Sequence, residues 1–233
     1  MDLENRMSMR PLALIPLALA LFAVGCSDVR QPIAVEPPPP GLHFLRWAGN
    51  TPPQFAVGDA ALAPSAVGLR LASLSDGVLS LDRNTATFWA VRGEPRTVQI
   101  NYLSATGDTS APFLRLTITD PVYVPGVGDL APGDSVQITV TIDPSTIKVS
   151  LEPTGTLFGD PAQMQISYGG ADGDLNGDGV VDPSDATIEQ QLLGMWYREG
   201  EGNAWTKIPA AQSLADKSFT SALAHFSEYL VAW

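Results

Sequence analysis

The sequence predicts an all-β protein, an antiparallel β-sandwich with at most one short helix. Three observations lead to this fold class. Glycine and proline are frequent, at 21 and 20 of the 233 residues, which favours short strands and turns over long helices. Apolar and polar residues alternate in several segments, as at Val98, Ile100 and Tyr102. Turn-forming clusters recur roughly every eight to twelve residues, which is the strand spacing of sandwiches and barrels.

The expected strands are distributed over two regions. Residues 45–85 are the less regular region, and we expect them to form leading strands of the sandwich or a small subdomain. Residues 86–233 are expected to form the main β-sandwich domain. The candidate strands are 68–74, 77–82, 85–91, 96–103, 113–119, 135–142, 147–153, 162–168, 192–199, 204–209, 218–224 and 226–233.

Composition and charge exclude some classes of partner. The formal net charge at pH 7 is −12 and the pI is about 4.4. Such a surface repels the phosphates of nucleic acids and of anionic lipids, so we expect no nucleic-acid partner. Hydrophobic residues make up 45% of the chain, which is enough for a buried core. The single cysteine, Cys26, excludes a disulfide within the chain.

Residues 1–25 have the layout of an export signal peptide. They contain a basic residue, Arg10, followed by an apolar run at 11–24 and then by the small residue Gly25, just before Cys26. The apolar run is too short for a comfortable membrane span, so the segment is expected to direct export rather than to cross the bilayer.

The end of this segment, AVGC, resembles the lipobox of bacterial lipoproteins, with Ala23 where leucine is commoner. The resemblance implies that Cys26 becomes the new N-terminus and is acylated, which anchors the protein to a membrane of the cell envelope. Ser27 follows the cysteine, and in that family this implies sorting to the outer membrane, facing the periplasm or the surface. Residues 26–44, with four consecutive prolines, would then be a stiff linker between the lipid anchor and the domain.

An acidic, glycine-rich stretch follows the candidate strand 162–168. The fifteen residues of DGDLNGDGVVDPSDA contain five aspartates and no lysine or arginine. Calcium takes six to eight oxygen ligands, and a twelve-residue loop supplies them at alternating positions, with a glycine at the bend. Residues 174–185 have this spacing. The expected calcium ligands are the side chains of Asp174, Asn176, Asp178, Asp182 and Asp185 and the backbone carbonyl of Val180.

The details of the loop refine this expectation. Gly179 lies at the bend, the side chain of Val180 is expected to point inward, and Asp182 is expected to act through a water molecule. Asp185 stands at the twelfth position, where glutamate is usual, so we expect weaker affinity than in a cytosolic calcium sensor. The alternative is a solvated acidic turn without metal. Crowded carboxylates argue against it, because like charges destabilise one another without a cation.

The sequence DLNGDGVVDPSDATIEQQLLG resembles one calcium-binding repeat of a bacterial dockerin, an EF-hand-like loop with aspartate at the twelfth position. Dockerins have two such repeats and bind a cohesin through their helices, whereas this chain has one repeat after an expected strand. We therefore expect the loop to join two strands and calcium to stabilise that connection, with a short helix at 184–193 capped by Asp182 or Ser184. A dockerin-like protein-docking module is the alternative.

The strands around the loop are similar to the closing strands of the β-sandwich domain shared by netrin receptors, ankyrins and zonula occludens proteins. The similarity covers about 147–233 and includes the ending His225, Phe226 and Ser227. Some members of that superfamily cleave themselves before this serine, which implies Ser227 as nucleophile and His225 as its helper. The alternative is that the motif closes the sandwich, with Phe226 in the core and its two neighbours facing the other way.

The sequence contains no nucleophile elbow, phosphate-binding loop or His-Glu-x-x-His motif, so we expect no enzyme but a structural or binding role, with a protein or a glycan as ligand. Tryptophan rings stack on sugars, but Trp89, Trp196 and Trp205 lie inside strand patterns and are expected in the core. Trp47 and Trp233 remain as candidates for an exposed sugar-binding face. The expected function is that of a calcium-binding, membrane-anchored extracytoplasmic lipoprotein.

Overall fold

The computed structural model describes residues 41–57, 79–80, 84–103 and 109–233, all within one compact unit, Glu36–Trp233. The expected signal peptide 1–25, the acylated Cys26 and the candidate strand 68–74 lie outside the described residues, as does nearly all of the linker.

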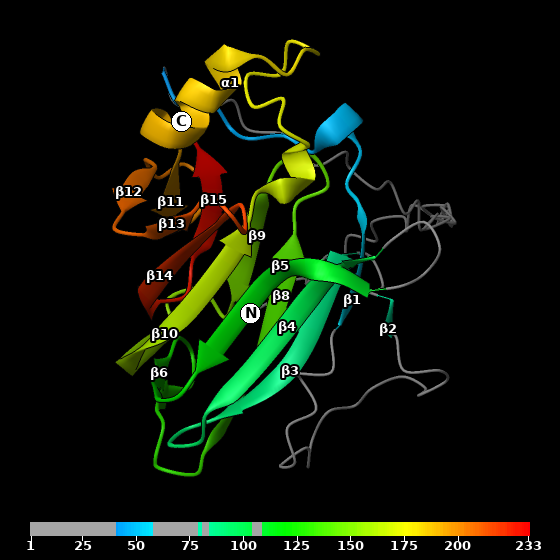
Figure 1. Ribbon diagram of the computed structural model, residues 1–233. Helices are drawn as coiled ribbons and strands as arrows, with labels where there is room; N and C mark the ends of the chain where they lie inside the picture. The colour runs from blue at the N-terminus through cyan, green and yellow to red at the C-terminus, as the bar shows by residue number, and fades with distance from the viewer. Residues whose placement is uncertain (1–40, 58–78, 81–83, 104–108) are drawn as a thin grey trace, which may run out of the picture. The chain divides into compact units, whose positions relative to one another are not determined.

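Two antiparallel sheets form the domain, which confirms the predicted fold class (Figure 1). The larger sheet has the order β13-β14-β10-β5-β4-β1-β2, and β6 pairs with both β10 and β7. Its strands are β1 (Gln54–Val57), β2 (Leu79–Ser80), β4 (Arg96–Leu103), β5 (Thr109–Ile118), β6 (Pro121–Val124), β7 (Gly128–Asp129), β10 (Leu157–Ser167), β13 (Ala211–Ser213) and β14 (Ser218–His225). The smaller sheet has the order β12-β11-β15-β9-β8-β3. Its strands are β3 (Thr85–Val91), β8 (Ser135–Ile142), β9 (Lys148–Glu152), β11 (Gly194–Arg198), β12 (Thr206–Ile208) and β15 (Glu228–Ala232).

The longest helical segment in the described part of the chain follows the acidic loop, as the sequence predicts. It consists of α1 (Pro183–Thr187) and a π-helical turn (Ile188–Leu192). Asp182 is the N-cap and Pro183 occupies the first helical turn, where its missing N–H costs nothing. Two single 3-10 turns lie at Ala48–Asn50 and Gly169–Ala171.

Strand periodicity determines which side chains enter the core. In β8, alternate side chains from Val136 to Ile142 are buried and those between them are exposed or half-buried. In β5, Leu114, Leu116 and Ile118 are buried in the same way. These residues from both sheets belong to one hydrophobic cluster, so the sheets are the two layers of a sandwich.

Residues 42–47, here called the N-terminal segment, lie between β15 and the residue that precedes β9. The backbone N–H of Leu45 donates to the carbonyl oxygen of Val231 at 3.1 Å, and the N–H of Ile147 donates to the carbonyl oxygen of Leu45 at 2.8 Å. Isolated bridges flank these bonds, from Phe44 to Ala232 and from Arg46 to Thr146. The segment is therefore hydrogen-bonded as a short additional strand.

The side chains of this segment pack in two places. Leu42 and Phe44, within the range where the sequence predicts a linker, contact a small apolar cluster that includes Leu230. Leu45 and Trp47 enter the main core. Trp47 is only 2% exposed, so the prediction that it forms an exposed sugar-binding surface is wrong. Burial of this large ring against other aromatic rings is more favourable than its exposure to water.

Replacing Gly170 with alanine is expected to lower the free energy of unfolding by about 1–3 kcal/mol, because overpacking strains a filled core. A Cβ atom at this position would lie 2.7 Å from Cζ3 of Trp47 and 3.2 Å from the hydroxyl of Tyr102. Urea-induced unfolding followed by circular dichroism measures the change. In a Trp47→Phe background, Gly170→Ala should lower the free energy of unfolding by less, because the smaller ring leaves room for the added Cβ atom. Equal costs in both backgrounds would contradict the clash.

Candidate metal centre

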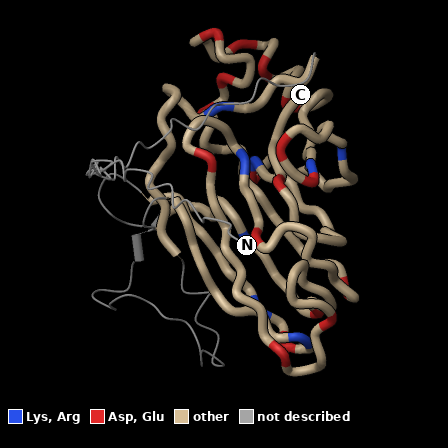
Figure 2. Tube along the Cα trace, turned by 180° about the vertical axis from the view of Figure 1, so that it is seen from behind, with Lys and Arg blue, Asp and Glu red and all other residues tan. Residues whose placement is uncertain are grey.

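The acidic loop connects the two sheets of the sandwich. It begins after β10 of the larger sheet and leads through α1 into β11 of the smaller sheet. The strand β10 and one 3-10 turn precede the loop, so its upstream flank is a strand, as the sequence predicts, and not the helix that precedes the loop in a dockerin. Several acidic residues lie along the loop, and no basic residue lies among them (Figure 2).

Asp174, at the first position of the loop, organises the backbone around its carboxylate. Its Oδ1 accepts hydrogen bonds from the N–H of Gly177 at 2.8 Å and of Asp178 at 3.2 Å, and its Oδ2 accepts from Gly179 at 2.9 Å. Gly177 and Gly179 have φ angles of 77° and 88°, in the left-handed region that glycine adopts without strain. The glycines therefore allow the chain to bend around the first carboxylate.

Asn176 and Asp178, at the third and fifth positions, are linked to each other. The Asn176 side-chain amide donates to Oδ2 of Asp178 at 3.1 Å and to the hydroxyl of Ser184 at 3.1 Å. Oδ1 of Asp178 accepts from the N–H of Val180 at 2.8 Å. Both side chains are exposed, so their oxygens are accessible from solvent.

Asp182 and Asp185 close the loop and start α1 with a capping box. Oδ1 of Asp182 accepts from the N–H of Ser184 at 2.7 Å, and Oδ2 of Asp185 accepts from the N–H of Asp182 at 2.9 Å. Oδ1 of Asp185 also reaches the beginning of the loop, accepting from the N–H of Leu175 at 2.8 Å and of Asn176 at 3.1 Å. Asp185 is 3% exposed, and it joins the two ends of the loop.

Hydrogen bonds to these two carboxylates lower their pKa values. The hydroxyl of Ser184 is the main cause for Asp182, and the N–H of Asp182 is the main cause for Asp185. The folded-state pKa values of both carboxylates lie below the ordinary value of 3.8, so the charged carboxylates stabilise the folded state above that pH. This contribution to the free energy of unfolding is lost as the pH falls through the lowered pKa values. Both groups are therefore negatively charged near neutral pH.

One expected feature of the loop is wrong. The side chain of Val180 is 59% exposed rather than directed inward, and its neighbour Val181 is 66% exposed. The loop lies at one end of the sandwich beside α1, and the described chain packs nothing over its tip (Figure 1). The backbone carbonyl of Val180 can still serve as a ligand, because that role does not depend on where the side chain lies.

The ligand atoms that the loop offers are of the kind that calcium binds. No group of three or more His, Cys, Asp or Glu side chains within the described ranges stands close enough to hold a metal ion. The loop nevertheless brings only oxygen donors, and calcium is a hard cation that prefers oxygen. Oδ1 of Asp174 and of Asp185 each accept two N–H groups, but Oδ2 of each accepts one and so keeps a second lone pair for a cation.

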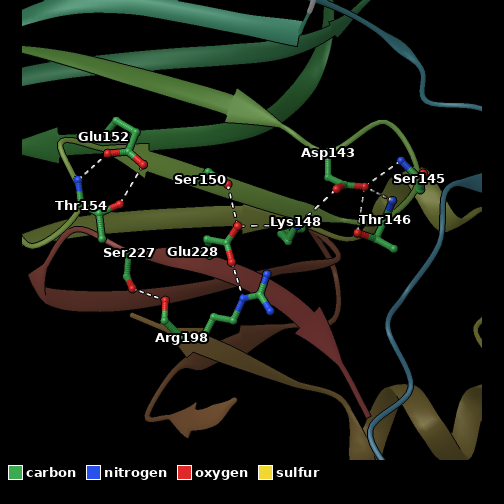
Figure 3. A network of polar contacts seen from close by, with 10 residues as sticks. All are labelled: Asp143, Ser145, Thr146, Lys148, Ser150, Glu152, Thr154, Arg198, Ser227 and Glu228. Carbon is green, nitrogen blue, oxygen red and sulfur yellow. Dashed lines mark hydrogen bonds and ion pairs between the residues drawn. The ribbon is translucent and has the colours of Figure 1, made fainter. Parts of the chain in front are cut away.

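The His225-Phe226-Ser227 ending forms the turn from β14 to β15. Phe226 is fully buried and contacts the ring of Phe158 edge-on, with ring centroids 4.8 Å apart. Ser227 is 1% exposed, and its hydroxyl donates a hydrogen bond to the carbonyl oxygen of Arg198 (Figure 3). Nδ1 of His225 lies 3.3 Å from the carbonyl oxygen of Phe226. The described partner of the Ser227 hydroxyl is thus a carbonyl oxygen and not the imidazole of His225.

A chain of charges lies beside Ser227 and links three strands of the smaller sheet (Figure 3). Arg198 on β11 pairs through Nε with Oε2 of Glu228 on β15. Oε1 of Glu228 lies 3.8 Å from Nζ of Lys148 on β9, and this ammonium lies 3.3 Å from Oδ2 of Asp143. Arg198 is 4% exposed. The network holds these charged side chains together across the sheet.

The tryptophans are arranged differently from the prediction. Trp89 is 40% exposed on β3 rather than in the core, because β3 alternates buried and exposed side chains and Trp89 lies on the outer face. Trp196 and Trp205 are partly buried in the small cluster with Leu42. Trp233 is partly buried, and its indole N–H donates to the carbonyl oxygen of Leu175 at 3.1 Å. Sequence spacing gives no signal for this last contact, since the two residues are far apart in the chain.

Comparison with known proteins adds no family to these observations. No model of a known protein family matches the chain, and no curated protein matches it. Over the described ranges, no helix has both the length and the apolar character needed to cross a bilayer.

Proposed function

We propose that this protein is a calcium-binding, lipid-anchored protein of the cell envelope with a structural or binding role. The observation that carries the proposal is Asp185, which is buried, accepts N–H groups from both ends of the acidic loop and stands at its twelfth position. A loop organised around its first and twelfth carboxylates fits the binding of a hard cation.

The ligands proposed for calcium are the side chains of Asp174, Asn176, Asp178 and Asp185, the carbonyl of Val180, and Asp182 through a water. When bound, the ion neutralises carboxylates that otherwise repel one another. Because the loop joins one sheet to the other, cation binding to the folded state alone would stabilise the sandwich.

The envelope location rests on the sequence pattern around Cys26 and on the proline-rich linker. An acyl chain buries methylene groups in the bilayer, so the domain would be tethered without spanning the membrane. Calcium is plentiful outside the cytoplasm, and the shorter Asp185 at the twelfth position suits the weaker sites of that environment.

Calcium is expected to raise the melting temperature of the wild-type chain by roughly 5–10 °C at a hundred times Kd, because such an excess stabilises the folded state by about 2.7 kcal/mol. Titration calorimetry and thermal melting, in calcium and in chelator, measure the binding. Asp178→Ala should weaken binding at least about tenfold by removing one charged ligand.

Asp160→Ala is the matched control, since Asp160 is an exposed aspartate outside the loop, on β10. It should bind calcium as the wild type does. Absence of heat at millimolar calcium, together with a melting temperature that chelation leaves unchanged, would overturn the proposal.

A further inference from the structure

The N-terminal segment is joined to the acidic loop through Trp233, which follows β15. The imidazole of His43 stacks on the indole of Trp233, with ring centroids 4.2 Å apart and an interplanar angle of 11°. The same two residues exchange backbone hydrogen bonds of 2.7 and 3.1 Å. The indole N–H donates to the carbonyl oxygen of Leu175, the second residue of the loop, at 3.1 Å. One side chain therefore contacts both the segment and the loop.

Leu175 connects this contact to the proposed calcium ligands. Its N–H donates to Oδ1 of Asp185 at 2.8 Å, and it lies between Asp174 and Asn176 in the chain. Its side chain is 7% exposed and belongs to the main core. The position of Leu175 thus depends both on the carboxylate of Asp185 and on the indole of Trp233.

A second contact joins the segment to the start of the loop. The ring of Trp47 fills the space where a Cβ of Gly170 would lie. Gly170 belongs to the 3-10 turn Gly169–Ala171 that leads into the loop, and its N–H donates to the hydroxyl of Tyr102 at 3.2 Å. The N-terminal segment therefore contacts the entry of the loop directly and its second residue through Trp233.

We propose that cation binding in the acidic loop and docking of the N-terminal segment are coupled through Leu175 and Trp233. The inference rests on the proposed function, since it names the regulation of the same loop. A cation that holds Asp174 and Asp185 also holds the backbone between them, which keeps the Leu175 carbonyl in place for the indole. Coupling of this kind is reciprocal, so a docked segment must also strengthen cation binding.

Hydrogen exchange and calorimetry on the full chain in detergent micelles test the proposal. In the wild type, the amides of His43 and Leu45 should exchange at least about tenfold more slowly in calcium than in chelator, within the usual range of coupling. Trp233→Phe keeps a ring against His43 but removes the indole N–H, and should weaken calcium binding about threefold to tenfold. Trp89→Phe, on β3, is the matched control and should leave calcium affinity unchanged.

The outcomes separate this inference from the proposed function. Wild-type protein that binds no calcium would overturn both. If the wild type binds calcium and Asp178→Ala binds it more weakly, the proposed function stands. If Trp233→Phe then binds calcium normally, and the hydrogen-exchange rates of His43 and Leu45 are the same in calcium and in chelator, only the coupling is overturned. Should Trp233→Phe fail to fold, His43→Ala replaces it, because removal of the stacked ring must also weaken calcium binding.

Discussion

Replacement of Trp47 with alanine is expected to lower the free energy of unfolding by about 4 kcal/mol, the range for deletion of a large buried aromatic side chain. The ring is 2% exposed and lies against Phe55 and Phe113, with centroid distances of 5.7 and 5.5 Å. Its indole N–H donates to the carbonyl oxygen of Asp143 at 2.9 Å. Alanine would leave a cavity and an unpaired carbonyl, and urea-induced unfolding measures the loss.

The control for this substitution is Trp89→Ala. Trp89 is 40% exposed, so its removal creates no buried cavity and should lower the free energy of unfolding by less than about 1 kcal/mol. Trp47→Phe should fall between the two, because it keeps a ring but loses the hydrogen bond to Asp143. Similar costs for Trp47→Ala and Trp89→Ala would show that the N-terminal segment does not belong to the folded core.

Glu228→Ala is expected to destabilise the fold by about 3 kcal/mol, because it removes the carboxylate that pairs with the buried guanidinium of Arg198. Glu228 pairs with Arg198, which is 4% exposed, and its other carboxylate oxygen accepts from Ser150 at 3.4 Å and faces Lys148. Chemical unfolding at neutral pH and moderate salt measures the effect.

Two further variants identify the cause. Glu94→Ala removes a carboxylate that is 55% exposed from its pair with Arg96, and it should cost less than about 1 kcal/mol. Arg198→Met combined with Glu228→Ala should be more stable than Glu228→Ala alone, since the double variant no longer buries the guanidinium that lost its carboxylate. A double variant as unstable as the single one would assign the loss to packing rather than to charge.

Local sequence signals were sufficient for the longer strands and for the position of the acidic loop, whereas the short strands β6, β7 and β13 had no candidate. The alternation in Ser135–Ile142 and Thr85–Val91 predicts β8 and β3, because successive side chains of a strand face opposite sides. The Asp182-Pro183 pair predicts the start of α1, since the cap and the first turn are built from neighbouring residues. The spacing of Asp174 and Asp185 identifies the two ends of the loop that hydrogen bonds then join through Leu175.

Contacts between distant residues had no such signal. The candidate strand pattern of Thr85–Val91 does not say which of its faces is covered, so Trp89 was expected in the core and is exposed. Val180 was expected inward by its place in the loop, but no described element lies over it. Trp47 was expected to be exposed because it lies near the start of the domain in the sequence. In the structure, the rings of Phe55 and Phe113 pack against it.

The sequence by itself determined the all-β class, the places of the longer strands and the spacing of acidic residues in the loop, because each depends on neighbours within one strand or one turn. Only the tertiary structure decided that the N-terminal segment packs beside β15 and that Trp233 reaches from it to Leu175. Those contacts depend on which strands become adjacent when the two sheets close on one core. Which strands become adjacent is decided by the burial of all the apolar faces together, and no single segment of the sequence determines it.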